Sequence, residues 1–146
     1  MPDGILRGVS RERVELVRQG FAAWNADDPQ WVLKHMSPEV EWITPDTDPY
    51  SGTYRGYAGV QEFWTRWRSA VGKLHFAVEE LMDGGDRVVV IARRRARNEQ
   101  TGLSVDDKIA QVFTFDEDDK CVRVQEFHGR EGAMQAAGLP DETAIG

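Results

Sequence analysis

The sequence predicts an α+β domain in which helices pack on one face of a cone-like, curved antiparallel sheet. Three stretches within the first 71 residues carry apolar side chains every three or four positions, the spacing of amphipathic helices. Four strand-like runs follow, separated by short polar turns, and this is typical of an antiparallel meander. A chain of 146 residues, 40% of them hydrophobic, fits a single domain spanning 1–146 with one core.

Local signals place the three helices. Ser10 is a candidate N-cap for the first, whose apolar stripe is Val14, Val17, Phe21 and Trp24. Asp28 and Pro29 start a short second helix, as cap and first helical residue, and Pro38 ends it. The third is expected to begin at Gly59, with an apolar stripe of Val60, Phe63, Trp64, Trp67 and Val71.

Alternation places the strands. Val40, Trp42 and Thr44 indicate a first strand, and later runs lie near 74–82, 87–97, 105–115 and 121–128. Residues 45–58 hold two prolines, two glycines and three tyrosines, which favours a loop. It is either a lid or binding loop, or a surface loop packed on its own tyrosines. A short closing helix over 131–137 ends at Gly138. A strongly bent sheet around helices leaves a hollow at the wide end of the cone.

Charge and cysteine content exclude several classes of function. The net charge is −7, and the one basic cluster is the short run 93–97, so we expect no nucleic-acid or membrane partner. The single thiol, Cys121, has no catalytic motif and suits a reducing cytoplasm. The N-terminus lacks the pattern of a signal peptide. His35, His75 and His128 are far apart, so we expect no metal and no cofactor.

Five runs resemble the SnoaL-like branch of the NTF2-like superfamily, which has a cystatin-like fold. They are Phe-Ala-Ala-Trp-Asn at 21–25, Pro-Glu-Val-Glu-Trp at 38–42, Tyr-Arg-Gly-Tyr-Ala-Gly-Val at 54–60, Gly-Asp-Arg-Val-Val-Val at 85–90 and Ala-Ala-Gly-Leu at 136–139. The resemblance covers nearly the whole chain. It implies a pocket protein related to ketosteroid isomerases, polyketide cyclases and epoxide hydrolases, a range too wide for the fold to select a reaction.

The resemblance also shows which known catalytic sets are missing. Ketosteroid isomerases place a base, a tyrosine and a protonated acid at the positions that Thr44, Gly20 and Gln111 occupy here. Threonine is no base at neutral pH, and glycine has no side-chain donor. Epoxide hydrolysis in this fold uses an Asp–Arg–Asp set, and the acid position after the last strand is Gly129. Neither reaction is therefore predicted in its known form.

Elimination leaves a small group of candidate catalytic residues. Gln111 shares parity with Ile109, Phe113 and Phe115, so it should face the interior, where it either bonds a neighbouring side chain or meets a ligand. His128 follows the last strand and could carry a proton. Arg93 and Arg95 share one face of their strand, and they either pair with acidic residues in solvent or reach the pocket mouth. The expected ligand-binding residues are Trp24, Trp42, Thr44, Tyr54, Trp64 and Phe113.

The sequence leaves two functions open. The first is a pocket that binds a small, largely apolar organic molecule and acts as an isomerase, cyclase or hydrolase without metal or cofactor. The second is a ligand-binding or dimerisation module without catalysis. A homodimer is expected through the outer face of the sheet, because Ala110, Val112 and Thr114 form an uncharged set there.

Overall fold

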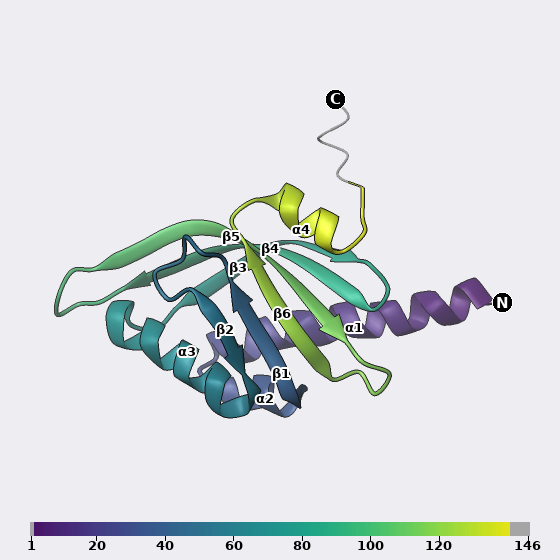
Figure 1. The fold of residues 1–146 in the computed structure, drawn as a ribbon, viewed down its shortest axis with the longest axis horizontal. Helices are drawn as coiled ribbons and strands as arrows, with labels where there is room; N and C mark the ends of the chain where they lie inside the picture. The colour runs from purple at the N-terminus through teal and green to yellow at the C-terminus, as the bar shows by residue number, and fades with distance from the viewer. Residues whose placement is uncertain (1, 141–146) are drawn as a thin grey trace.

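The computed structural model describes the backbone of residues 2–140 and the side chains of residues 11–140 (Figure 1). Helices and strands follow in the predicted order, apart from one additional strand. The helices are α1 (Pro2–Asn25), α2 (Pro29–Lys34), α3 (Gly56–Val71) and α4 (Arg130–Ala136). The strands are β1 (Met36–Thr44), β2 (Gly52–Arg55), β3 (His75–Asp83), β4 (Arg87–Arg97), β5 (Ser104–Phe115) and β6 (Cys121–Phe127).

The six strands form one curved, unclosed sheet in the order β2-β1-β6-β5-β4-β3. Strands β3 to β6 make the predicted antiparallel meander. The expectation of a wholly antiparallel sheet is wrong at one place, because β1 pairs parallel to β6. β1 and β6 are far apart in the chain, and the intervening helix and strands form the crossover that a parallel pair requires.

The two faces of the sheet hold separate apolar clusters. One face, with Val88, Val90 and Phe113, packs against the stripes of α1, α2 and α3. Helix α2 begins as predicted, with Asp28 accepting a hydrogen bond from the backbone N–H of Trp31 and Pro29 in the first turn. The α+β class, with three N-terminal helices on a curved sheet and a short C-terminal helix, is confirmed.

The opposite face of the sheet is covered by α4. Ala110 and Val112 are buried there against Ala133, Met134 and Ala137. The helix ends as predicted, with Gly138 at φ 70°. The uncharged surface that suggested a dimer interface is therefore covered by the chain's own helix. Dimerisation stays a prediction, but this surface no longer supports it.

The sequence suggested one loop over residues 45–58, but the structure divides this segment. Gly52–Arg55 form β2, which pairs with the end of β1, and α3 begins at Gly56 instead of Gly59. Tyr54 lies opposite Trp42 in this pair. Gly56 has a φ of 69°, a conformation that favours glycine, so the chain can turn directly from the strand into the helix.

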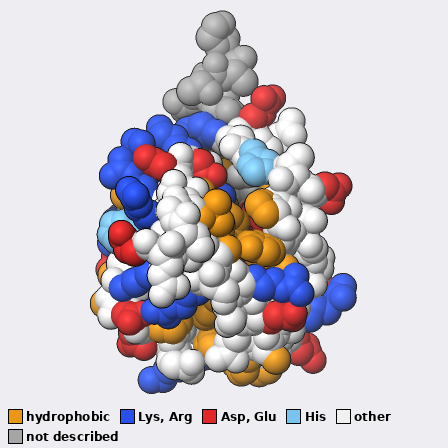
Figure 2. All heavy atoms as spheres, turned by 90° about the vertical axis from the view of Figure 1, so that its left-hand side faces the viewer, with side chains coloured by type: hydrophobic (Ala, Val, Ile, Leu, Met, Phe, Trp, Pro, Cys, Tyr) orange, Lys and Arg blue, Asp and Glu red, His pale blue; other side chains and the backbone are white. Residues whose placement is uncertain are grey.

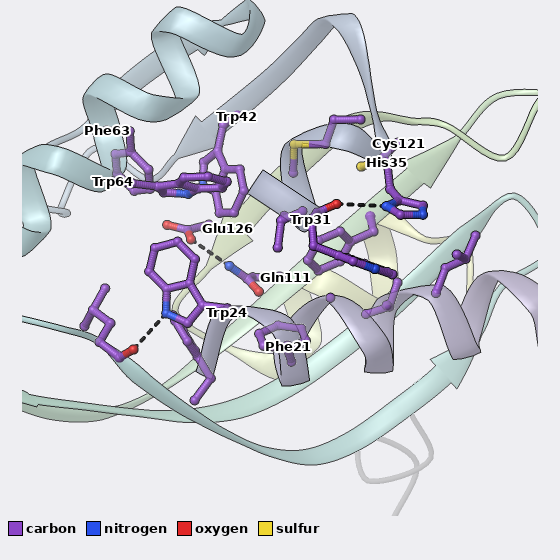
Figure 3. Close-up of a pocket in the computed structure, with 18 of the residues that line it drawn as sticks. Phe21, Trp24, Trp31, His35, Trp42, Phe63, Trp64, Gln111, Cys121 and Glu126 are labelled. Atoms are coloured by element: carbon purple, nitrogen blue, oxygen red, sulfur yellow. Dashed lines mark hydrogen bonds between the residues drawn. The ribbon is translucent and has the colours of Figure 1, made fainter. Parts of the chain in front are cut away.

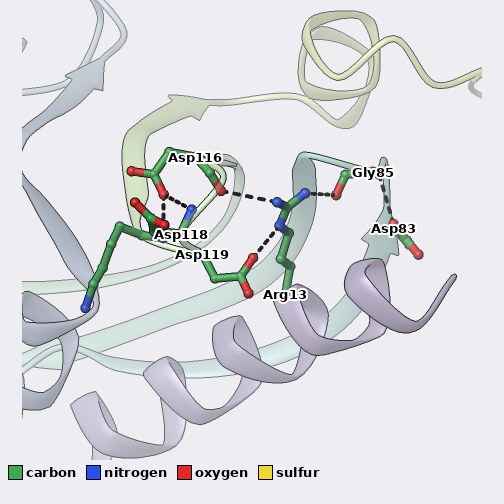
Figure 4. A network of polar contacts seen from close by, with 7 residues as sticks. Arg13, Asp83, Gly85, Asp116, Asp118 and Asp119 are labelled. Carbon is green, nitrogen blue, oxygen red and sulfur yellow. Dashed lines mark hydrogen bonds and ion pairs between the residues drawn. The ribbon is translucent and has the colours of Figure 1, made fainter. Parts of the chain in front are cut away.

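A polar network fastens α1 to two turns of the sheet (Figure 4). Arg13 Nε donates to Asp119 Oδ1 at 2.9 Å, and its Nη atoms donate to the carbonyl oxygens of Gly85 and Asp116. Asp116 Oδ1 in turn accepts from two backbone N–H groups of its own turn. The network thus joins α1 to the β3–β4 and β5–β6 turns, and it has a structural role.

Candidate functional site

A cavity of about 80 Å³ lies between the helices and the concave face of the sheet (Figure 3). α1 contributes Phe21 and Trp24, α2 contributes Trp31, and α3 contributes Phe63 and Trp64, so aromatic rings form most of the wall. Trp24 and Trp64 meet edge to face, with ring centroids 5.0 Å apart. This wall suits a small apolar or aromatic molecule.

Two buried polar side chains from neighbouring strands lie in this apolar space. Gln111 on β5 and Glu126 on β6 are direct cross-strand partners, 2% and 5% exposed. Gln111 Nε2 donates to Glu126 Oε2 at 2.8 Å. Figure 3 shows the pair in the cavity close to Trp24 and Trp42. The amide therefore holds one oxygen of the carboxyl group and leaves the other without a protein hydrogen bond.

Burial sets the acidity of Glu126. Loss of solvation raises the pKa of the carboxyl group from its ordinary value of 4.5 to about 7. The hydrogen bond from Gln111, the charge of Arg94 and the indole N–H of Trp42 each oppose this change in part. The Trp42 N–H lies near the carboxylate but falls short of hydrogen-bond geometry. Glu126 can consequently give or take a proton close to neutral pH.

Arg94 brings a buried positive charge to the same cavity. It is 4% exposed, and its Nε and Nη2 donate to Asp107 at 3.0 and 2.9 Å. Its guanidinium stacks 4.6 Å from the ring centroid of Trp67. Burial lowers the pKa of Arg94, but the hydrogen bonds and charge of Asp107, together with the charges of Glu126 and Asp48, outweigh burial and raise it. Arg94 therefore stays charged beside Glu126.

Four buried polar atoms in the cavity wall have no hydrogen-bond partner among the described residues. They are Glu126 Oε1, Gln111 Oε1, Trp42 Nε1 and Trp67 Nε1. A buried polar group without a partner costs about 1–3 kcal/mol, and proteins rarely leave several together. Two acceptors and two donors around one cavity fit a molecule that carries oxygen.

The cavity brings together five of the residues singled out from the sequence. Gln111 is buried as its parity predicted, and the aromatic residues on this wall are Trp24, Trp42, Trp64 and Phe113. Thr44 and Tyr54 are buried elsewhere. Thr44 Oγ1 accepts from the backbone N–H of Gly52 at 2.9 Å, and the Tyr54 hydroxyl donates to the carbonyl oxygen of Tyr50 at 2.8 Å. Both therefore fasten the β1–β2 connection.

The charged candidates lie away from the cavity. Arg93 and Arg95 both bind Asp106 on the outer face of the β4–β5 hairpin, at 2.8 and 3.4 Å. His128 follows the end of β6 and is exposed. None of the three lines the cavity, and the arginine that does is Arg94. The two arginines thus match the alternative interpretation, in which they pair with acidic residues in solvent.

Sequence reasoning missed Glu126 and Arg94 for two physical reasons. Counting back from the β5–β6 turn places Gln125 opposite Gln111, but a bulge at Val122 shifts the register and puts Glu126 there instead. β4 is apolar on both faces, because α4 covers the outer one, so alternation does not tell which arginine faces the cavity. The usable signal was the parity that Glu126 shares with Val124.

Within residues 11–140, no three His, Cys, Asp or Glu side chains group in a way that could hold a metal ion. Cys121 lines the cavity, but burial raises the pKa of its thiol to about 12.

No helix in the described part of the chain has both the length and the apolarity to cross a membrane. Figure 2 shows basic and acidic side chains intermixed on one face of the molecule.

With this fold and site in place, comparison identifies the class of protein. Residues 17–124 match the model of the SnoaL-like domain, so the chain belongs to the SnoaL-like family. No curated protein matches the sequence.

Three solved structures illustrate the likeness. An NTF2-like protein from Burkholderia thailandensis E264 is 26% identical, with a TM-score of 0.72 and coverage of 88% of this chain and 98% of that one. Bal32a, from a soil-derived mobile gene cassette, is 22% identical, with a TM-score of 0.74 and coverage of 87% and 96%. TerC, which was co-crystallized with polyporic acid, is 24% identical, with a TM-score of 0.70 and coverage of 86% and 98%. The latter two share the fold alone.

Proposed function

We propose that this protein binds a small, largely apolar organic molecule that carries oxygen, and that Glu126 moves a proton on it. One observation carries the proposal: a buried carboxyl group lies in an aromatic cavity with one oxygen unpaired. In such surroundings the pKa of Glu126 lies at about 7, where a general acid or base works best in neutral solution.

The other polar groups have separate roles in this proposal. Gln111 holds Glu126 Oε2, so Oε1 is the atom that faces the substrate. The N–H groups of Trp42 and Trp67 are donors for a carbonyl or enolate oxygen, and one such donor contributes roughly 3 kcal/mol to a developing oxyanion. The charge of Arg94 favours the ionised form of Glu126, the form that acts as a base. Proton transfer beside a carbonyl is the reaction class that uses all of these groups.

The test is exchange of hydrogen for deuterium next to the carbonyl of an aryl ketone, followed by NMR in heavy water. Acetophenone is the probe, because its ring and single oxygen match the cavity. We expect the protein to accelerate exchange and Glu126→Gln to remove the acceleration, by roughly a hundredfold or more. Glu117→Gln, which removes the same charge from an exposed turn, is the matched control.

Each outcome separates the functions left open by the sequence. Exchange that Glu126→Gln leaves intact contradicts the assigned role of Glu126. Binding of acetophenone without exchange favours the non-catalytic ligand-binding module. Absence of binding contradicts the apolar-ligand pocket itself.

A further inference from the structure

A second hollow of about 150 Å³ lies outside the cavity, between the end of α1, the start of α2, α3 and the loop before β3. Three residues, Trp24, Trp64 and Leu74, line both spaces. Two of these residues contact each other, since Trp24 Nε1 donates to the carbonyl oxygen of Leu74 at 2.7 Å. The two spaces are therefore neighbours that share one partition.

The outer hollow differs from the cavity in its charge. Its titratable side chains are Arg68, Lys73 and Asp27, which leaves one positive charge in excess. Arg68 reaches Asp27 at 3.2 Å with both side chains more than half exposed, and Lys73 donates to the carbonyl oxygen of Asn25. Local positive charge is notable on a chain of net charge −7. It favours an anionic group and disfavours a cationic one.

The inner cavity offers an anion no free positive partner. The guanidinium of Arg94 is already paired with Asp107, and an anion beside Glu126 would disfavour the ionised form of this buried acid still further. A ligand with one apolar, oxygen-bearing end and one carboxylate would therefore bind in a single orientation. Its apolar end would contact Glu126, and its carboxylate would lie in the outer hollow.

We propose that the outer hollow is a subsite for a carboxylate, and that the ligand is an apolar keto acid or a similar anion that extends past Trp24 and Trp64. The inference rests on the proposed function of the cavity, because it assumes that the apolar end binds there. Beyond that function, it names the class of substrate, and it gives Arg68 and Lys73 the role of selecting a carboxylate.

Two probes that differ by one charge test this subsite. 4-Oxo-4-phenylbutanoate has the aryl ketone and a carboxylate three carbons away, and its methyl ester is neutral. Binding of each is measured by calorimetry. We expect the acid to bind roughly fivefold more tightly than the ester, the scale of two exposed charge contacts, and the difference to shrink in 1 M salt.

Charge variants with a matched control locate the effect. Arg68→Gln combined with Lys73→Gln should remove the preference for the acid over the ester, because the acid loses affinity. Arg66→Gln combined with Arg55→Gln removes the same charge outside the hollow and should preserve the difference. Ester binding with no preference for the acid, or an equal loss in both double variants, overturns the subsite and leaves the cavity standing. Failure of both probes to bind contradicts the proposed function and removes the subsite with it.

Discussion

Replacing Glu126 by glutamine should change how stability depends on pH. The folded state raises the pKa of this group from 4.5 to about 7, and each pKa unit corresponds to about 1.4 kcal/mol. Ionising the buried carboxyl group therefore destabilises the fold by roughly 3 kcal/mol at pH 8. Glutamine keeps the shape and accepts the hydrogen bond from Gln111, but it does not ionise.

The direction of this pH dependence follows from the number of protons that the folded and unfolded states bind. Between pH 4.5 and about 7 the folded chain holds a proton at Glu126 that the unfolded chain has released, so the contribution of this group falls as pH rises. Below pH 4.5 both states are protonated, and above about pH 8 both have lost the proton. The stability of Glu126→Gln relative to the native protein should thus rise by roughly 3 kcal/mol between pH 4.5 and pH 8.

Urea unfolding at four pH values, followed by tryptophan fluorescence, measures this difference. Subtracting the two proteins at each pH cancels the other titrating groups, since they are common to both. Glu117→Gln, which removes a glutamate from an exposed turn, is the matched control. A difference for Glu126→Gln that does not change with pH would refute the reasoning.

Three further predictions concern neighbouring features. Asp107→Asn leaves the charge of Arg94 uncompensated, so the pKa of Glu126 should fall by about one unit. The pH profile of ketone exchange should then move to lower pH. A profile that does not move contradicts the electrostatic coupling between Arg94 and Glu126. Arg13→Gln should lower the free energy of unfolding by about 1–2 kcal/mol in urea, whereas the exposed Arg18→Gln should change it by under about 0.5 kcal/mol, and equal effects argue against the network. Met134→Ala should lower the free energy of unfolding by about 2–4 kcal/mol. It should also promote association, measured by light scattering, because it uncovers part of the sheet face. A variant that is as stable and as monodisperse as the native protein contradicts this prediction.

The helices and the meander could be predicted because their signals are local. A helical stripe or an apolar strand between polar turns is visible within a dozen residues, and the cap at Asp28 and the end at Gly138 depend on single residue types. Strand β2 was missed because a four-residue strand that begins at Gly52 and is followed directly by Gly56 gives too short an alternation. The parallel pairing of β1 and β6 joins distant segments, so no local pattern carries it.

The candidate site was predictable only in part. The interior position of Gln111 follows from strand parity, but the identity of its partner depends on a bulge that shifts β6 by one residue. The choice between Arg94 and its neighbours depends on which face the helices cover, a tertiary property. The pairing of Gln111 with Glu126 therefore depends on strand register, whereas the sequence pattern alone led to Arg93, Arg95 and His128.

The most direct test of the account is the protonation of Glu126 itself. The protein is labelled with ¹³C at glutamate side-chain carboxyl groups, and the resonance missing from Glu126→Gln is followed by NMR from pH 4 to pH 9. We predict a midpoint at about 7, well above the ordinary glutamate value of 4.5. A midpoint near the ordinary value of 4.5 would contradict the buried acid–base site and the function proposed for it.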